Sequence, residues 1–356
     1  MLRRAALVLT ASSLVVGLVA GPALACGGLV SPNGTIALVR TTTMAAYHNG
    51  MEHYVTGFEF AGGGAEFGSI VPLPGIPKRV IRGGDWTLQR LEIEVNPRVL
   101  LAPQALAAGA AEFDRAKVIL KKSIDSLDLT VLKGGGFAVG KWAADHGFQL
   151  TPDAPAMLDF YAKRSPIFMA VQFNAKRAEA RGEQLGDAVP IHLVIPTNRP
   201  WVPLRILALG AKKAQPIQAD VFLLTDRAPA MLPVPLGSPE FGPAAKGLKL
   251  RVSRAASSSL LADLRSDRGM KWLPRSGMWL TFLSLDARAS DLDYDLAMDV
   301  SGRGQPLPRD AGFGLGARTT SAGSNGGLWA LWSGLALIGM MFAVALRERR
   351  AGRLAL

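Results

Sequence analysis

The sequence predicts an α+β fold, a mixed or antiparallel β-sheet domain with several packed helices, followed by one C-terminal transmembrane helix. Two observations predict the domain. Short segments rich in β-branched residues occur early and late in the chain, and segments with apolar residues at helical spacing lie between them. A third observation, a long uncharged segment near the C-terminus, predicts the membrane helix.

The first strands are predicted to form a hairpin. Residues 35–43 are rich in β-branched side chains, and residue types over residues 53–60 alternate with the two-residue period of a strand. Asn49-Gly50 lies between them and is a strong hairpin signal, because both residues tolerate positive φ. A third strand is predicted over residues 67–72, where Pro72 ends it.

Helices are predicted mainly in the middle of the chain. Asp85 is expected to cap a helix over residues 86–95, and apolar spacing predicts a longer helix over residues 104–123. Shorter helices are predicted at residues 139–146, 155–163 and 258–266. The later strands are predicted at residues 167–173, 189–195, 204–209, 221–225, 248–252, 279–285 and 294–300.

Residues 1–25 have the three parts of a secretory signal peptide. Arg3 and Arg4 precede an apolar run, and Ala23-Leu24-Ala25 fits the small-x-small pattern of a cleavage site. Cleavage there makes Cys26, the one cysteine of the chain, the first mature residue. Three alternatives remain for its thiol: lipidation, a free or intermolecularly paired thiol, or a structural bystander. Ala23 stands where lipoprotein processing usually has leucine.

Residues 328–346 are uncharged and long enough, at about 1.5 Å per residue, to cross a hydrocarbon core of roughly 30 Å. Arginines dominate the tail that follows, residues 347–356, which therefore is expected in the cytoplasm. Residues 26–300 are then an extracytoplasmic domain, joined to the cell membrane by a flexible linker over residues 301–327. Removal of the helix by a sorting protease is the alternative to permanent single-pass anchoring.

The net charge of +12 is concentrated partly at the two ends of the chain. Arginines precede the apolar run of the signal peptide and follow the predicted membrane helix. The remaining excess is spread along the domain, and no basic-aromatic recognition pattern accompanies it. The sequence therefore predicts no nucleic-acid partner. The predicted partners are the membrane, through the C-terminal helix, and an envelope protein or other surface component.

Several stretches together resemble an exported bacterial family known as domain of unknown function 2330. The resemblance lies in Cys26-Gly27-Gly28 and in the strand-and-proline patterns of residues 66–74, 190–197 and 203–209. It implies the same exported α+β domain, from about Cys26 to Val300, with a C-terminal anchor. It implies no activity. Members of the family often carry further cysteines near the first, and this chain has none.

The predicted hairpin suggests one candidate metal site. His48 and His53 would lie on one face as diagonal neighbours, about 7–8 Å apart, which is marginal for one metal ion. Glu52 would point to the opposite face, so a third ligand would have to come from elsewhere, with His146 and His192 distant in sequence. Solvated histidines near a hairpin tip are the simpler interpretation.

Asp291, Asp293 and Asp295 suggest a second candidate, because three carboxylates in alternation resemble a calcium loop. The sixth and twelfth positions of such a loop are Leu296 and Gly302 here, where glycine and glutamate are expected. A half-buried strand with its acidic side chains in water explains the alternation more simply.

The sequence contains no motif that requires a cofactor. The glycine triplets lack the Gly-Lys-Ser/Thr ending of phosphate loops, and no Gly-x-Ser-x-Gly elbow is present. The favoured interpretation is a non-enzymatic binding module of the cell envelope. The alternatives are a hydrolase-like envelope enzyme whose site forms only in the fold, and a carrier of a metal or small ligand.

Overall fold

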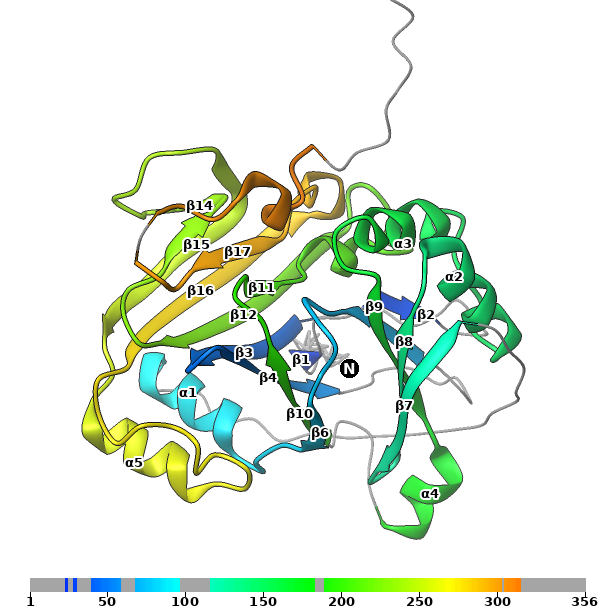
Figure 1. Ribbon diagram of the computed structural model, residues 1–356, viewed down its shortest axis with the longest axis horizontal. Helices are drawn as coiled ribbons and strands as arrows, with labels where there is room; N and C mark the ends of the chain where they lie inside the picture. Colours follow the sequence, from blue (N-terminus) through cyan, green and yellow to red (C-terminus); the bar gives the residue numbers. More distant parts are fainter. Residues whose placement is uncertain are drawn as a thin grey trace, which may run out of the picture. The chain divides into compact units, whose positions relative to one another are not determined.

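The helices and the two large sheets form four layers, in the order α/β/β/α, and alternate side chains of the strands are buried on opposite faces of each sheet. The computed structural model describes residues 23–24, 28–30, 40–58, 68–96, 116–182, 189–302 and 304–314. Helices α1 (Thr87–Val95) and α5 (Ser258–Ser266) cover one face of a nine-stranded sheet. Helices α2 (Gly136–Asp145) and α3 (Ala154–Ala162) cover a five-stranded sheet (Figure 1). The predicted α+β class is confirmed.

The nine-stranded sheet is mixed. Its order is β14 (Val234–Leu236), β15 (Ala244–Ala255), β16 (Trp279–Arg288), β12 (Pro216–Thr225), β3 (Arg40–His48), β4 (Met51–Phe58), β10 (Val189–Pro196) and β6 (Arg79–Arg82), with β1 (Ala23–Leu24) paired to β3. The pairs β14–β15, β12–β3 and β1–β3 are parallel, and the other pairs are antiparallel.

The other two sheets are antiparallel. The five-stranded sheet has the order β2 (Gly28–Val30), β5 (Gly68–Pro72), β9 (Ile167–Phe173), β8 (Leu127–Lys133) and β7 (Lys117–Ile124). The small sheet contains β11 (Trp201–Val202), β17 (Leu296–Asp299) and β13 (Ala230–Leu232). Helix α4 (Ala175–Ala180) follows β9, and 3-10 turns occur at Arg205–Ala208, Ala289–Asp291 and Pro308–Ala311.

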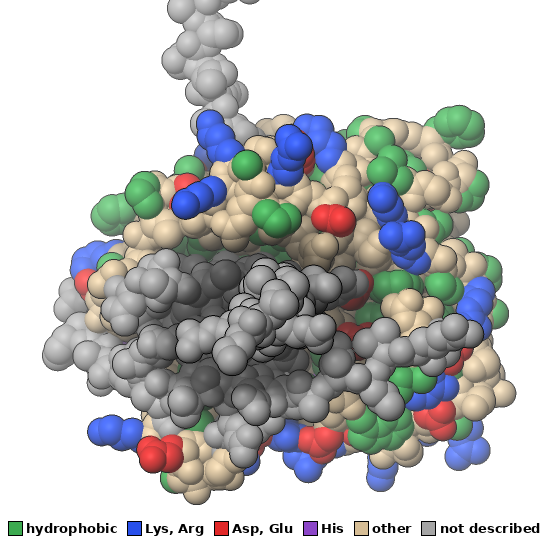
Figure 2. All heavy atoms as spheres, turned by 180° about the vertical axis from the view of Figure 1, so that it is seen from behind, with side chains coloured by type: hydrophobic (Ala, Val, Ile, Leu, Met, Phe, Trp, Pro, Cys, Tyr) green, Lys and Arg blue, Asp and Glu red, His purple; other side chains and the backbone are tan. Residues whose placement is uncertain are grey.

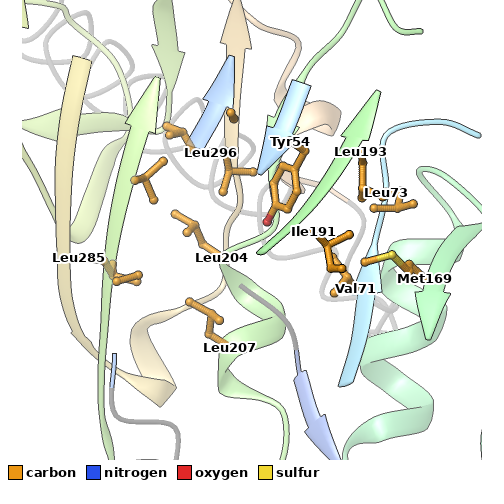
Figure 3. Close-up of a cluster of buried hydrophobic side chains, with 14 of the residues drawn as sticks. Tyr54, Val71, Leu73, Met169, Ile191, Leu193, Leu204, Leu207, Leu285 and Leu296 are labelled. Carbon is orange, nitrogen blue, oxygen red and sulfur yellow. The ribbon is translucent and has the colours of Figure 1, made fainter. Parts of the chain in front are cut away.

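The main hydrophobic core lies between the two large sheets. Leu193 and Ile191 of β10 meet Val71 of β5 and Met169 of β9 there (Figure 3). Alternate residues of the same strands point the other way: Ile70 and Phe168 pack under α2 and α3. This two-residue period explains why both faces of each large sheet are buried.

The predicted hairpin is confirmed with its register. His48 pairs with Met51 and Ala46 with His53. Asn49 and Gly50 form the two-residue turn at φ of 50° and 74°, the left-handed region that this turn type requires.

Helix α1 begins where the sequence predicts, but its cap is different. Asp85 does not cap the helix; its carboxylate pairs with Arg82 instead. The carboxylate of Asp267, remote in sequence, accepts hydrogen bonds from the backbone N–H groups of Asp85 and Trp86 and from the Thr87 hydroxyl. These bonds outweigh the effect of burial and lower the pKa of Asp267. The cap therefore joins α1 to the end of α5.

Two predicted elements are wrong in type. The predicted helix over residues 104–123 ends in a region that forms β7, since Lys117–Ile124 pairs along its length with β8. The apolar run Val118-Ile119-Leu120 contains β-branched residues that suit a strand, and the partner strand decides between the two structures. The predicted strand over residues 204–209 is a 3-10 turn at Arg205–Ala208.

The domain extends past the predicted boundary at Val300. The turn Pro308–Ala311 packs on β17, where the Ala311 carbonyl accepts from the Asp295 N–H and Ala311 is fully buried. Within the described parts of the chain, every helix is too short or too polar to span a bilayer. The predicted membrane helix, the tail predicted to be cytoplasmic, Cys26, and residues 1–22 and Ala25 of the predicted signal peptide lie outside the described residues.

Candidate functional site

A buried pair of histidines lies between the nine-stranded sheet and the segment that follows α5. His53 on β4 and His192 on β10 are diagonal neighbours, because His53 pairs with Val194 and His192 with Val55. Nδ1 of His53 lies 2.9 Å from Nε2 of His192. The side chains are 7% and 1% exposed, respectively, so this hydrogen bond is shielded from water.

Both imidazoles are neutral at neutral pH. Burial, followed by the charges of His192, His48 and Arg79, lowers the pKa of His53 to about 3. Burial and the charge of Arg79 lower the pKa of His192 to about 4. A neutral pair can share only one proton along its hydrogen bond. In either tautomer, Nδ1 of His192 is buried and has no hydrogen-bond partner among the described residues.

The segment between α5 and β16 covers this pair. The ring of Trp272 stacks on His53 with 3.4 Å between ring centroids and 9° between planes. Gly269 sits over His192, and a Cβ added there would be 3.5 Å from Nδ1 of His192, on a backbone with a φ of +75°. The pair thus joins this segment to the sheet by stacking and close packing.

Glu52 lies on the opposite face of β4, as the sequence predicts from the alternation of a strand. Its side chain is fully buried between the two large sheets, and neither carboxylate oxygen has a hydrogen-bond partner among the described residues. Burial raises the pKa of Glu52 well above its usual range. Burial thus favours the neutral form of Glu52, whose side chain faces away from the histidine pair.

The predicted metal candidates of the hairpin are separated. His48 pairs with Asp226, with 2.6 Å between Nδ1 and Oδ1, whereas His53 pairs with His192. The other histidine, His146, stacks on Trp142, and its Nδ1 lies 2.8 Å from the Trp142 carbonyl. Over the described ranges, no three His, Cys, Asp or Glu side chains come together closely enough to hold a metal ion.

The three aspartates of the predicted calcium candidate also separate. Asp291 belongs to a 3-10 turn and Asp293 is exposed, but Asp295 is fully buried. The expected strand with its acidic side chains in water is thus wrong for Asp295. Its Oδ1 accepts from the Tyr161 hydroxyl at 2.8 Å and from the backbone of Leu204 and Arg205, and its Oδ2 forms an ion pair with buried Arg164.

The Arg164 guanidinium is enclosed as completely as its partner. Its central carbon lies 3.7 Å from the ring centroid of Trp201 and 5.3 Å from that of Tyr161. The ion pair therefore joins α3, the small sheet and the turn at Pro308–Ala311. Asp295 is a structural centre, not an open cation site.

A groove of about 380 Å³ lies on the same side of the sheet as α1 and α5. The end of α1 forms one wall, and β15 and β16 form the floor; the lining residues are Val95, Asn96, Arg251, Val252, Phe282 and Ser284. Arg251 is exposed, and its Nε donates to the Ser284 hydroxyl at 2.7 Å. The groove combines an apolar floor with a cation, a hydroxyl and an amide, as ligand pockets commonly do.

The groove opens beside an exposed strand edge. Strand β15 pairs with β14 only through Ala244 and Lys249, so from Leu250 onward its described neighbour is β16 alone. Two nearby apolar side chains are unusually exposed: Leu236, the last residue of β14, at 45%, and Phe241, in the loop that follows, at 97%. Exposed strand edges and exposed apolar side chains are both common features of contact surfaces.

On the face shown in Figure 2, the positive charge of the described residues is dispersed. On the described part of the face in Figure 2, Lys and Arg side chains lie singly or in small groups, with acidic side chains among them. Around Asp125, for example, Arg82 and Arg181 are both neutralised by the same carboxylate. This distribution differs from the continuous basic stripe of nucleic-acid-binding surfaces.

The sequence alone did not identify the main features of this region. His53 and His192 are 139 residues apart, and their contact depends on β4 and β10 being neighbours. One signal was present: His192 is a single polar residue inside the apolar strand Pro190-Ile191-His192-Leu193-Val194. No comparable signal marks the groove, because its walls come from three separate elements.

Comparisons with known proteins give a family and a few distant structures. The crystal structure of baculovirus P35 is similar with a TM-score of 0.39 and 10% identity, covering 77% of this chain and 99% of that chain. A mutated baculovirus P35 after caspase cleavage gives 0.37 and 9%, covering 73% and 99%. The caspase-8/P35 complex gives 0.37 and 9%, covering 73% and 96%.

None of the curated proteins compared matches the sequence. The family match extends over residues 20–229, which is more than half of the chain. It agrees with the resemblance seen in the strand-and-proline patterns. The chain belongs to the family described as an uncharacterized protein conserved in bacteria (DUF2330).

Proposed function

We propose that this protein is a membrane-anchored binding module on the extracytoplasmic side of the cell envelope. The signal-peptide pattern of residues 1–25 and the arginine-flanked apolar segment over residues 328–346 support this location. In this proposal the helix is the contact with the membrane, and the domain binds another envelope protein or surface component. No cofactor is required.

One observation carries the binding role: the groove between α1 and β15 opens onto an exposed strand edge. Both features lie on one side of the domain, and the strand carries exposed cations along this edge. Leu236 adds exposed apolar surface where β14 ends. A surface with an apolar centre and a charged border is typical of sites that bind other macromolecules.

The second candidate is an envelope enzyme of the hydrolase type, with the histidine pair as its acid–base group. A neutral histidine held by a second histidine resembles an oriented general base. The pair favours a structural role, however, because it is buried and no described carboxylate or nucleophile bonds to Nδ1 of His192. Ester or peptide hydrolysis by the purified full chain, abolished by His192→Gln, would establish the enzyme instead.

In-cell photo-cross-linking tests the binding role. A photoreactive amino acid replaces the exposed Ser253 on β15, and the matched control carries it at the exposed Lys133 of the five-stranded sheet. We expect a discrete adduct at position 253 only, and we expect Arg251→Glu to reduce it. Absence of an adduct at position 253, or the same adducts at both positions, would contradict this binding surface.

A further inference from the structure

We infer that the partner is an extended peptide segment that adds to the open edge of β15 as a further strand, with acidic side chains toward the cations of β15 and an apolar side chain in the groove. This inference rests on the proposed function and names the chemistry of the partner. Strand addition provides affinity through backbone hydrogen bonds and specificity through pockets for alternate side chains.

The strand edge becomes open at a defined point. Leu236, the last residue of β14, pairs with Lys249. The chain then turns away at Gly237, which has a φ of +87°, and a Cβ there would be 3.5 Å from the Leu250 carbonyl oxygen. From Leu250 to Ala255, β16 is the one described strand beside β15. Arg251, Ser253, Arg254 and Ala255 are exposed, so this edge is accessible.

The groove lies where side chains of an added strand would reach it. Alternate residues of a strand point to the same face, with about 6.6–6.8 Å between them. Val252 and Phe282, a cross-strand pair, form the groove floor on the face that α1 covers. The volume of about 380 Å³ lies at the lower end of ligand pockets. The groove therefore suits one or two apolar side chains of a bound strand.

The charges on this edge select an acidic partner. Lys249 and Arg251 are exposed, and among the described residues Arg251 makes one polar contact, to Ser284. Arg254 is already paired with Glu94 at 2.7 Å. A second copy of the same edge would bring like charges together, which disfavours self-pairing. An acidic strand would instead form charge-assisted contacts with Lys249 and Arg251.

The test uses the full chain in nanodiscs and a labelled peptide of Glu-Thr-Val-Thr repeats, in which Glu and Val share one strand face, because Arg251 and the groove also share one face. A peptide with Lys in place of Glu is the charge control. Two further peptides carry N-methyl groups on alternate amides, so that each blocks the hydrogen bonds of one edge of the bound strand. We expect the acidic peptide to bind at least about tenfold more tightly than the basic one. We expect only one of the two methylated peptides to lose binding.

Charge reversal in the protein provides the matched control. Arg251→Glu should weaken the acidic peptide by about tenfold and improve the basic one, whereas Lys133→Glu, on the other large sheet, should change neither. Thermal unfolding of both variants verifies that they are folded.

Three results would overturn strand addition. These are equal binding of the two methylated peptides, no preference for the acidic peptide, and no binding of any peptide. If cross-linking at position 253 still occurs in cells, the surface binds a partner by another mode. If that cross-link is absent as well, the proposed function fails with it.

Discussion

At the scale of single residues, the most consequential groups are charged or titratable side chains that the fold removes from water. Asp295 and Arg164 illustrate the energetic risk. Their side chains are 0% and 2% exposed, and the two form an ion pair with each other. Removing one partner of such a pair leaves an uncompensated buried charge, which costs far more than the pair itself contributes.

Asp295→Asn is therefore expected to destabilise the protein by about 3–5 kcal/mol. The amide retains the size of the side chain but leaves the Arg164 charge unpaired. Chemical denaturation, followed by circular dichroism, measures the loss in the free energy of unfolding. Asp293→Asn is the control, since Asp293 is exposed and its change should stay within about 0.5 kcal/mol. Equal effects of the two variants would contradict the structural role of Asp295.

The histidine pair makes the free energy of unfolding depend on pH in the acidic range. The pKa of each folded histidine, about 3 for His53 and about 4 for His192, lies below the ordinary value of 6.5. Below pH 6.5 the unfolded chain therefore binds more protons, and the free energy of unfolding falls with decreasing pH. The loss continues until the pH reaches the folded pKa values, at up to about 1.4 kcal/mol per pH unit for each histidine.

His53→Phe should reduce this loss between pH 6 and pH 4.5, because one titrating group is removed while an aromatic ring remains to stack on Trp272. The measurement is the free energy of unfolding of both proteins across this pH range. Ser253→Ala, an exposed change on β15 that removes no titratable group, should leave the slope close to that of the wild type. If His53→Phe and the wild type show parallel curves, the histidine pair does not control acid stability.

Glu52 has the opposite dependence. Its folded pKa is raised, so above about pH 4.5 the unfolded chain loses a proton that the folded protein retains, and stability falls as pH rises. Glu52→Gln should remove this fall. Compared with the wild type, the variant should therefore gain more stability at pH 8 than at pH 5. Unfolding curves at both pH values test it; an unchanged difference between wild type and variant would show that Glu52 is ionised in the fold.

At the scale of secondary-structure elements, the contacts between elements decide what the sequence leaves open. The start of α1 is an example. Asp85 fits the sequence pattern of a cap, but Asp267 performs the function from a position 182 residues away. Local side chains and distant ones compete for the same N–H groups, and the tertiary structure selects the one that is also buried.

Asp267→Ala should therefore cost about 1–2 kcal/mol of stability, whereas Asp85→Ala should cost about 0.5 kcal/mol or less. The first change removes three hydrogen bonds to the start of α1, and the second removes exposed ion pairs with Arg82 and Arg268. Thermal unfolding of the two variants beside the wild type distinguishes the caps. A larger loss of stability for Asp85→Ala than for Asp267→Ala would show that Asp85 is the cap.

Strand β7 shows the same principle for the type of an element. The spacing of apolar residues near its start is compatible with a helix, but β8 offers a complete antiparallel partner. Backbone hydrogen bonds to a neighbouring strand outweigh the weak helical preference of a short segment. Elements without such competition, including α5 and β9, have the bounds that the sequence predicts.

At the scale of the whole molecule, the predicted layout can be tested directly. The mature protein isolated from membranes should lack residues 1–25 and retain residues 328–346. Intact-mass spectrometry measures both ends at once, and an added mass at Cys26 would reveal lipidation. A mass that includes residues 1–25 contradicts cleavage at Ala25, and a mass that ends before residue 328 contradicts permanent anchoring.

The α+β class, the hairpin at Asn49-Gly50 and many of the strands and helices can be predicted from the sequence, because they depend on local patterns of polarity and backbone freedom. The sequence also contained the family resemblance, whose family the match over residues 20–229 shows. The contacts of His53 with His192, of Asp295 with Arg164 and of Asp267 with α1 could not be predicted in this way. Each joins segments separated by more than 130 residues, so strand order and layer packing, not local pattern, bring them together.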